Sequence, residues 1–394
     1  MLHGSKLALG AVLSLGLVLG AEAKVDVMCV YYPHWHRYPK GDEWFGAENW
    51  KQGEWAYVKT AKPRFPGHNQ PLVPYGGFRD ESDPKQMAVD IALAANAGID
   101  VFLYDYYYYN GEITQEDALE KGFLGADNRS RMKFALMWCY HERNNQFRPK
   151  SGEPRVPLMS LAHTPEEFLG LIDLSVARYF HRPEYYRKDG KLFFSMYNAK
   201  WFIDNNGGVE GVRGLFAWAQ EEVRKAGLPP IHFSGMVRKA EEVGDVTKAG
   251  FESTSLYCVT PYDCENGQER MEKKGEMIFG YGEFVEAQKR LNESIAAVSP
   301  AHIPLAVRGW DCTARCDPAE PYPWKESAYP YMGIFDKATP EKFERVLRAV
   351  KKSALEDPKK PGAVLINAWN EYTEGSWLVP DKRNGDAYLK VVKR

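Results

Sequence analysis

Short apolar runs alternate with amphipathic stretches along most of this chain. Each run is rich in Val, Ile, Phe, Leu or Tyr and is flanked by polar or turn-forming residues, which is typical of buried β-strands. The pattern predicts eight strands, at residues 25–32, 100–106, 133–138, 192–197, 231–236, 252–257, 303–308 and 363–367.

Helical patterns lie between several of these runs. Residues 84–97 show helical spacing of apolar residues and end before Gly98, and glycine commonly terminates helices. Residues 165–180 follow Thr164, which we expect to cap the helix, with Glu167 in the capping-box position. Two further helices are predicted at residues 215–226 and 340–355.

Strands that alternate with helices predict one α/β domain over residues 24–394, a (β/α)8 TIM barrel. The alternative is an open doubly wound sheet, which usually carries a Gly-rich phosphate loop after an early strand. Pro33 and His34 follow the first predicted strand instead, so the barrel is favoured. Two long segments, 33–83 and 260–301, are expected as loops over the C-terminal face, where barrel active sites form.

The first 23 residues resemble a signal peptide. Lys6 supplies the positive charge, residues 7–21 are apolar, and Ala21-Glu22-Ala23 fits a cleavage site of small residues. The alternative is an uncleaved anchor, but the apolar run is shorter than the roughly 20 residues that span a membrane. We therefore expect a mature chain that begins near Lys24, has no membrane span and is secreted or periplasmic.

Composition narrows the class of partner. The net charge is −2 and no basic patch stands out, so nucleic acid is an unexpected partner. Aromatic residues make up 13% of the chain, which suits stacking on sugar rings but serves equally for packing.

Among the cysteines, Cys29 and Cys139 fit packed core thiols, whereas Cys258 with Cys264, or Cys312 with Cys316, could form disulfides.

Polar and aromatic residues gather where the predicted strands end. Because the ends of parallel strands meet on one face of a barrel, they are expected to surround one pocket, where rings stack on sugars and polar groups bind hydroxyls. Any single ring has packing as its alternative role. These candidate substrate-binding residues are Tyr32, His34, His36, Asp105, Tyr106, Trp138, Tyr197, Tyr257, Arg308, Trp310, Asp311, Trp369, Asn370 and Tyr372.

Glu371 and Glu374 form the sharpest candidate pair. In a helical turn the side chains of residues i and i+3 share a face, and two carboxylates that close cannot easily both ionise. A protonated acid beside an ionised base is the combination that glycosidic cleavage requires. The alternative is two solvated glutamates in a polar loop, although Trp369, Tyr372 and Trp377 around them favour a shielded pocket.

The histidines suit hydrogen bonding better than metal binding. His34 and His36 alternate along an extended stretch and should point in opposite directions, so they make a poor pair of metal ligands. His68 and Gln70 lie in a turn-rich segment, residues 66–71, and either line the site or hold their own loop together. No cluster of ligands has convincing metal-binding spacing, so no metal or cofactor is expected.

Three segments carry a family resemblance. Residues 31–36 read Tyr-Tyr-Pro-His-Trp-His, residues 309–315 read Gly-Trp-Asp-Cys-Thr-Ala-Arg, and residues 367–375 read Asn-Ala-Trp-Asn-Glu-Tyr-Thr-Glu-Gly. With Gly53-Glu54-Trp55 and the segment 66–71, they resemble the signatures of the WbsX-like, family 99-like glycoside hydrolases. The resemblance runs over about residues 25–393 and adds Arg315 to the candidate binding residues.

The resemblance implies a (β/α)8 barrel, no required metal and cleavage with retention. In the family 99 endo-α-1,2-mannosidases, the first of two glutamates deprotonates the 2-hydroxyl of the sugar, and a 1,2-anhydro sugar forms. The second glutamate acts as general acid and then as general base. These roles fall on Glu371 and Glu374, and the implied substrate is an α-linked polysaccharide or oligosaccharide, manno- or rhamno-configured.

Two other functions remain open at this point. The chain could be a glycosyltransferase of surface-polysaccharide synthesis, but it shows no Asp-x-Asp motif for a nucleotide-sugar donor. It could also be a glycan-binding protein without catalysis, which the presence of both Glu371 and Glu374 disfavours.

Overall fold

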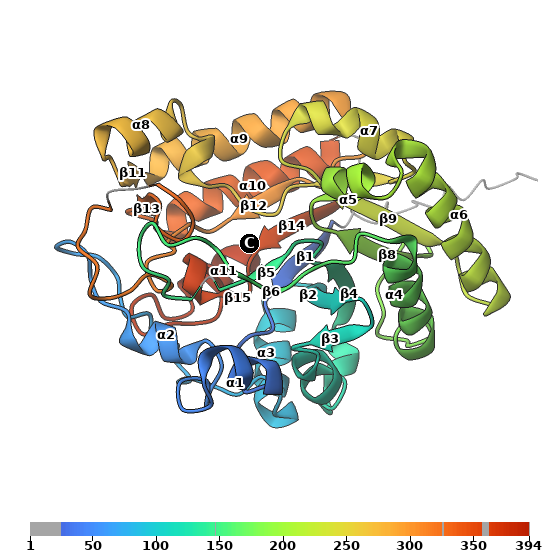
Figure 1. The fold of residues 1–394 in the computed structure, drawn as a ribbon, viewed down its shortest axis with the longest axis horizontal. Coiled ribbons are helices and arrows are strands. Elements are labelled where there is room, and N and C mark those ends of the chain that lie inside the picture. The colour runs from blue at the N-terminus through green and yellow to red at the C-terminus, as the bar shows by residue number, and fades with distance from the viewer. Residues whose placement is uncertain (1–24, 146, 325–326, 357–361, 394) are drawn as a thin grey trace, which may run out of the picture.

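Parallel strands form the centre of the molecule, a computed structural model that describes residues 25–145, 147–324, 327–356 and 362–393 (Figure 1). The predicted signal peptide and its cleavage site lie outside the described residues. The central strands are β1 (Asp26–Tyr31), β2 (Val101–Tyr109), β4 (Lys133–Trp138), β8 (Lys191–Met196), β9 (Ile231–Met236), β10 (Ser253–Ser255), β12 (Leu305–Val307) and β14 (Ala363–Asn367).

These strands pair in the order β10-β9-β8-β4-β2-β1-β14-β12. Between β10 and β12 the contact shrinks to one parallel bridge, Thr254 with His302. There the Thr254 N–H donates to the Ala301 carbonyl at 2.9 Å, and the Ile303 N–H donates to the Thr254 carbonyl at 2.8 Å. The sheet is therefore a nearly closed barrel of eight parallel strands, as the sequence predicted.

The predicted helices surround this barrel. They are α3 (Pro84–Asn96), α4 (Pro165–Arg178), α6 (Gly208–Lys225) and α10 (Pro340–Glu356). Helix α6 begins earlier than residue 215 because Val212 continues its buried face. Thr164 makes no side-chain bond at the start of α4. Instead the Glu167 carboxylate accepts the backbone N–H groups of Ala162, His163 and Asn110, at 3.1, 3.3 and 2.9 Å.

The expectation that residues 260–301 form a loop was wrong. Most of that segment is α9 (Tyr281–Val298), which contacts β12 as a barrel helix. Its barrel-facing side includes two buried polar residues, Gln288 and Asn292, which broke the apolar periodicity in the sequence. The Asn292 amide accepts from the Leu305 N–H at 2.8 Å and donates to the Leu305 carbonyl at 3.0 Å, so it binds the edge of β12.

Shorter elements complete the fold. The helices are α1 (Pro39–Phe45), α2 (Trp55–Thr60), α5 (Ala199–Asn205), α7 (Val243–Lys248), α8 (Gly267–Lys274) and α11 (Ala387–Lys393). The strands are β3 (Glu112–Thr114), β5 (Arg143–Asn144), β6 (Pro157–Met159), β7 (Arg187–Lys188), β11 (Ile278–Gly280), β13 (Ile334–Asp336), β15 (Asn370–Glu371) and β16 (Ser376–Trp377).

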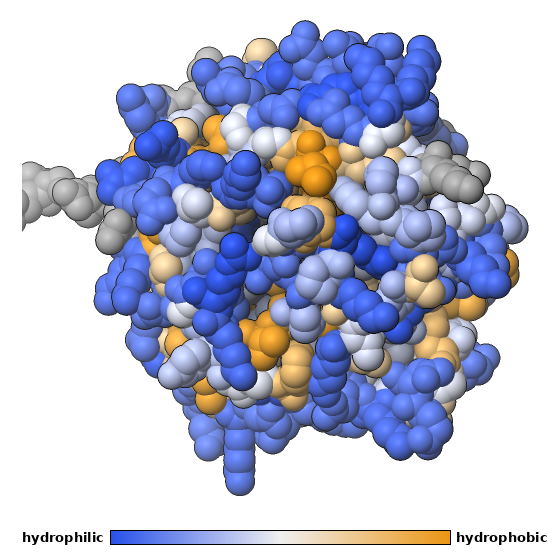
Figure 2. Space-filling view, turned by 90° about the vertical axis from the view of Figure 1, so that its left-hand side faces the viewer, coloured by the Kyte–Doolittle hydropathy of each residue, from blue (hydrophilic) through white to orange (hydrophobic). Residues whose placement is uncertain are grey.

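The barrel strands end on the left of Figure 1, where α2, β11 and β13 also lie. Figure 2 looks onto this end, where hydrophilic side chains dominate and apolar ones are exposed only in small groups. The first long segment, 33–83, was expected here and carries α1 and α2. A small aromatic cluster of Tyr38, Trp50, Tyr57 and Phe147 holds it together.

All six cysteines lie in the described part of the chain and are free thiols, so neither of the two possible disulfides is present. Cys29 and Cys139 are buried, as expected of core thiols. Within the described residues, no helix combines the length and apolarity that crossing a membrane requires.

Candidate active site

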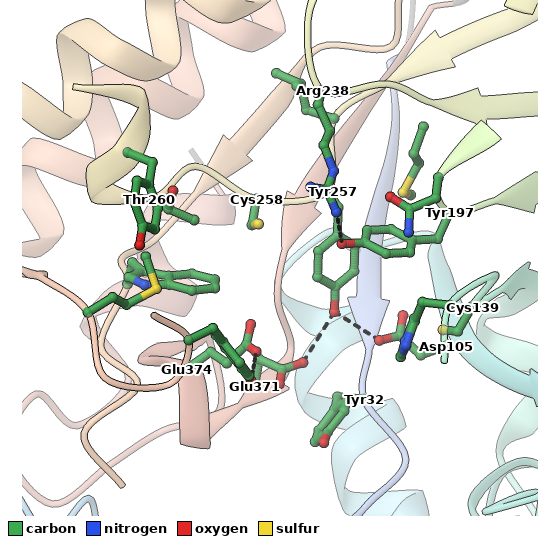
Figure 3. Close-up of a pocket in the computed structure, with 18 of the residues that line it drawn as sticks. Tyr32, Asp105, Cys139, Tyr197, Arg238, Tyr257, Cys258, Thr260, Glu371 and Glu374 are labelled. Atoms are coloured by element: carbon green, nitrogen blue, oxygen red, sulfur yellow. Dashed lines mark hydrogen bonds between the residues drawn. The ribbon is translucent and has the colours of Figure 1, made fainter. Parts of the chain in front are cut away.

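The two glutamates lie where the last barrel strand ends. After β14 the chain forms a tight hairpin in which β15 pairs with β16, and residues Tyr372–Glu374 make one 3₁₀ turn between them. In such a turn the side chains of residues i and i+3 eclipse each other. Glu371 and Glu374 therefore point together into a cavity of about 840 Å³ (Figure 3).

The hairpin is fixed by a glycine contact. Gly375 has a φ of +78°, and an added Cβ would lie 2.5 Å from the backbone nitrogen of Asp311. That nitrogen donates to the Glu374 carbonyl at 2.6 Å. The loop after β12 is thus joined directly to the turn that carries the glutamates, and no larger residue fits at position 375.

One guanidinium bridges both carboxylates. Arg315 donates from Nη2 to Glu371 Oε1 at 3.0 Å and from Nη1 to Glu374 Oε1 at 2.6 Å. Its Nε donates to Thr373 Oγ1, and Nη2 also donates to the Tyr32 hydroxyl, both at 3.0 Å. The Arg315 side chain is only 2% exposed, so its hydrogen bonds are filled by protein groups. Arg315 therefore positions the two glutamates.

A third buried carboxylate lies behind Arg315. Glu54 Oε2 accepts from the Thr373 hydroxyl at 2.7 Å and lies 3.7 Å from Arg315 Nη2. Glu54 Oε1 accepts from the Tyr32 hydroxyl and lies 3.1 Å from His34 Nδ1. Burial opposes its ionisation, but Arg315 and the bonds from His34 and Tyr32 outweigh burial and lower the pKa of Glu54 to about 2. Glu54 is therefore a permanent counter-charge for Arg315.

The pKa values of Glu371 and Glu374 are raised, in contrast to that of Glu54. Burial, and then the charge of Glu374, raise the pKa of Glu371 well above its ordinary value, although Arg315 opposes the shift. Burial also raises the pKa of Glu374, against the same opposition. Two neighbouring carboxyls with raised pKa values do not readily ionise together, so the pair favours holding one proton.

Two tyrosines orient the glutamates from opposite walls. The Tyr257 hydroxyl lies 3.3 Å from Glu371 Oε2 and donates to Asp105 at 2.9 Å. The Tyr329 hydroxyl donates to Glu374 Oε1 at 2.6 Å. Burial raises the pKa of Asp105, the third acid of the cavity, well above its ordinary value, which favours its protonated form. Its Oδ1 is buried without a partner and faces the same space.

Several of the predicted site residues do meet in this cavity. They come from the ends of different strands and from the loop after β12, as expected if the strand ends surround one pocket. In the described part of the chain the predicted residues that line the cavity are Tyr32, Asp105, Tyr197, Tyr257, Trp310, Arg315, Glu371 and Glu374. Their roles in binding or catalysis stay predictions.

Tyr106 and Trp138 lie outside the cavity because strand side chains alternate between two faces. Asp105 points into the barrel, so Tyr106 points out toward the helices, where its hydroxyl lies 3.1 Å from that of Tyr179. The Trp138 indole N–H donates to the Tyr108 carbonyl at 3.1 Å. Both rings pack the outer layer of the barrel, which corrects their assignment as binding residues.

His34 and His36 also lie behind the cavity wall. Burial and the neighbouring Arg143 lower the pKa of His34 to about 3, so its ring is neutral and serves Glu54. His36 points elsewhere, as its alternation with His34 predicted, and its Nδ1 lies 2.9 Å from Glu81. Neither ring lines the cavity.

The segment 66–71 holds the loop after β12. His68 Nε2 lies 2.9 Å from Asp311 Oδ2, and the Gln70 amide donates to the same oxygen at 3.1 Å. Asp311 also accepts from the backbone and hydroxyl of Thr313. Of the two roles left open for His68, the structure supports the loop-holding one, and Gln70 and Asp311 share it.

Arg308 is a packing residue. Its guanidinium lies 3.4 Å from the centre of the Trp377 ring and 4.0 Å from that of Tyr388. Asp381 lies 3.9 Å away. The side chain is thereby turned away from the cavity, in contrast to its predicted role in substrate binding.

The remaining predicted residues shape the hairpin from behind. Asn370 donates to the Tyr32 carbonyl and accepts from the Tyr32 N–H, both at 2.8 Å, which ties β15 to the end of β1. The Tyr372 ring packs edge-on against Trp35, with centroids 5.2 Å apart, and Trp369 is fully buried. These three therefore support the site without lining it.

The sequence did not single out Glu54, Thr373 or Tyr329 as site residues. Glu54 and Thr373 stand within matched signature segments, and that was the only available signal. Tyr329 lies in an irregular loop after β12, where no periodicity pointed to it. Within the described residues, no group of three or more His, Cys, Asp or Glu side chains could hold a metal ion.

The chain matches the family described as Glycosyltransferase WbsX over residues 27–392. Two uncharacterized proteins named WxcX, from Xanthomonas campestris pv. campestris strains B100 and ATCC 33913, are 25% identical to it over 98% of this chain and 52% of their own length. The chain thus spans about half the length of these curated relatives.

Among solved structures, the GH99 endo-α-mannosidase from Bacteroides thetaiotaomicron has a TM-score of 0.57 at 17% identity, over 93% of this chain and 95% of that one. A chain described as a glycoside hydrolase-like protein gives 0.58 at 16% identity, over 94% and 93% of the two chains. These structures share the fold of this protein. Since the family match covers nearly the whole chain, the protein belongs to the WbsX family.

Proposed function

We propose that this protein is a glycoside hydrolase that cleaves α-linked glycans with retention, through participation of the sugar's own 2-hydroxyl. The observation that carries the proposal is the pair Glu371 and Glu374, buried in one cavity, bridged by Arg315 and each with a raised pKa. One protonated and one ionised carboxyl is the pairing that glycosidic cleavage uses. The fold shared with a GH99 endo-α-mannosidase supports it.

In the first step the Glu371 carboxylate takes the proton of the 2-hydroxyl while that oxygen attacks C1. The bond between C1 and the leaving oxygen breaks, and Glu374 protonates that oxygen. In the second step the Glu374 carboxylate takes a proton from water, which attacks C1 and opens the three-membered ring. The 2-oxygen recovers its proton from Glu371. Two inversions at C1 give net retention.

Substrate binding sets the protonation state that these two reaction steps need. Burial favours one proton on the pair in the free protein. A sugar 2-hydroxyl that donates to Glu371 favours the ionised form of Glu371, and a glycosidic oxygen beside Glu374 favours the protonated form of Glu374. Bound substrate therefore places the proton on Glu374. Because its pKa is raised, ionised Glu371 is a stronger base toward a hydroxyl than an ordinary carboxylate.

Transfer from a nucleotide sugar is the second candidate function, favoured by the description of the matching family. Hydrolysis is the stronger proposal because residues 1–23 resemble a signal peptide, which would take the protein away from cytoplasmic sugar donors. We therefore also propose that the mature protein acts outside the cytoplasm.

A panel of α-linked polysaccharides and oligosaccharides tests the function. Purified protein should release reducing ends from at least one member, and proton NMR of fresh product should show the α-anomer. The Glu371→Gln/Glu374→Gln double variant is the control for contaminating hydrolases. Product of β configuration would exclude the retaining route. Glycan extension that depends on an added nucleotide sugar, without hydrolysis, would establish the transferase instead.

A further inference from the structure

The arginines of the cavity wall are not equally neutralised. Arg155, Arg238 and Arg315 line the cavity. Arg315 is bound by Glu371, Glu374 and Glu54 as described above. Among the described residues, no carboxylate lies within 4.0 Å of a guanidinium nitrogen of either Arg155 or Arg238. Two cationic groups of the wall thus lack an anionic partner.

Arg238 stands on the Glu371 side of the site. It follows the end of β9, and its Nη2 lies 3.4 Å from the Tyr197 hydroxyl. The Tyr197 ring packs edge-on against Tyr257, whose hydroxyl reaches Glu371 (Figure 3). Glu242 accepts from the Arg238 backbone N–H at 2.8 Å and acts on the guanidinium only through space. The side chain is solvent-accessible, so a ligand can reach it.

Arg155 stands on the Glu374 side. Its Nη2 donates to the Tyr329 carbonyl at 2.7 Å, and its guanidinium lies 5.1 Å from the centre of the Tyr329 ring. The hydroxyl of the same tyrosine binds Glu374. The two arginines therefore flank the glutamate pair, each separated from it by tyrosine side chains.

The acids of the same wall are held by other groups. Asp105 accepts from the Tyr257 hydroxyl, and Glu371 and Glu374 are bound by Arg315. Asp263 accepts from the backbone and hydroxyl of Thr260, and Arg238 acts on it only through space. Glu142 lies 3.7 Å from His163. In the described part of the chain, Arg155 and Arg238 are thus solvent-exposed cations of the wall with no carboxylate in contact, so an anionic group of a ligand can pair with them.

We propose that Arg238, assisted by Arg155 across the site, binds an acidic substituent of the glycan, so that the natural substrate is an acidic polysaccharide. A guanidinium pairs with carboxylate, sulfate or phosphate through two parallel N–H donors, which neutral sugar hydroxyls cannot match. The identification of the ligand as a glycan rests on the proposed function. Binding of an anion beside the glutamates does not.

Binding measurements separate the two. The probes are the methyl α-glycosides of mannuronic, glucuronic and galacturonic acids, each with its neutral parent hexoside, and methyl α-mannoside carrying a 6-sulfate or a 6-phosphate. GDP-mannose is the probe for a nucleotide donor. Affinities come from calorimetry or ligand-observed NMR on wild type, Arg238→Gln, Arg238→Lys and Arg155→Gln. Arg213→Gln removes the same charge from exposed helix α6, where Arg213 pairs with Glu210, and is the matched control.

Wild type and Arg213→Gln should bind at least one acidic glycoside about tenfold more tightly than its neutral parent, as one charge-assisted pair provides. Arg238→Gln should abolish that preference, Arg238→Lys should keep part of it, and Arg155→Gln should reduce it. Which acidic probe binds best identifies carboxylate, sulfate or phosphate as the substituent.

Equal affinity for acidic and neutral sugars, no binding by any acidic glycoside, or a preference unchanged in Arg238→Gln would overturn the proposal. So would GDP-mannose binding that exceeds every glycoside and depends on Arg238. Because no turnover is measured, a preference for acidic sugars without hydrolysis of any glycan would refute the hydrolase and leave the anion subsite standing.

Discussion

Replacing Arg315 by Met should destabilise the protein by an amount that grows as pH rises. The substitution keeps much of the side-chain volume but leaves Glu54, Glu371 and Glu374 buried without their shared counter-charge. Breaking a buried ion pair by removing one partner typically costs about 3–5 kcal/mol. We expect a loss of that order at pH 8.

The pKa of Glu54 gives a second measure of the same effect. A carboxyl whose pKa is lowered from 4.5 to about 2 on folding stabilises the folded state by about 3 kcal/mol once the pH is above 4.5. That stability is lost progressively as pH falls from 4.5 through about 2, so in wild type Glu54 stays ionised from pH 5 to 8. Without Arg315 this stabilisation shrinks, since Arg315 is the largest influence that lowers the pKa of Glu54.

The pH dependence follows from the sign of the shifts. Arg315 lowers the pKa of all three carboxyls, so removing it raises each pKa. A carboxyl with a raised pKa contributes stability that is fully present below 4.5 and is lost as pH rises through the folded-state pKa. The difference between wild type and Arg315→Met should therefore be smaller at pH 5 than at pH 8.

Urea denaturation at pH 5, 6.5 and 8, followed by tryptophan fluorescence, measures the difference. Arg308→Met is the control, because Arg308 is similarly buried but contacts mainly the rings of Trp377 and Tyr388, with the Asp381 carboxylate at 3.9 Å. Its loss of stability should change less with pH than that of Arg315→Met. A constant difference for Arg315→Met, or one that grows toward pH 5, would show that Arg315 does not serve as the counter-charge of these carboxyls.

Three further predictions follow from the same site. Trp310→Ala should weaken substrate binding with the fold intact, because Trp310 lines the cavity, whereas Tyr106→Ala should cost about 3–5 kcal/mol of stability because its ring is buried. Ligand titration and urea denaturation of both variants check this, and a stable Tyr106→Ala with impaired binding would contradict it. Activity should survive dialysis against EDTA, since two carboxylates suffice for the chemistry; loss that one metal alone restores would refute this. N-terminal sequencing of the exported native protein should begin near Lys24, and an intact Met1 on a membrane-bound product would count against export by cleavage.

The sequence predicted the barrel because its strands are short, uniformly apolar runs. Parallel strands covered by helices on the outside have such sequences because both of their faces are buried. It missed α9 because Gln288 and Asn292 face β12 and bind its backbone, so polar residues occupy positions that are usually apolar. A buried amide that pairs with a strand edge looks in sequence like an exposed loop residue.

The candidate site was predictable where local spacing decides geometry. Glu371 and Glu374 were expected together from their separation of three residues, and the 3₁₀ turn places them so. Spacing could not decide which strand-end residues face inward. Asp105 and Tyr106 are neighbours in the chain, yet one lines the cavity and the other packs outside, and that depends on where each strand begins its alternation.

Arg315 illustrates a second limit of prediction from sequence. Its place in a signature segment marked it as a site residue, but not whether it holds substrate or protein. That distinction depends on Glu54 and Thr373, which come from distant parts of the chain and fill its hydrogen bonds. Such partners become visible only in three dimensions.

The central claim is that Glu371 and Glu374 have different catalytic roles. The direct measurement is turnover of an activated aryl α-glycoside of the sugar found in the panel, by wild type, Glu371→Gln and Glu374→Gln. With a leaving group that needs little protonation, Glu374→Gln should retain much of the first step, whereas Glu371→Gln should lose at least about 10²-fold, the typical contribution of general acid–base assistance. Full activity in both variants, or loss confined to Glu374→Gln, would contradict the account.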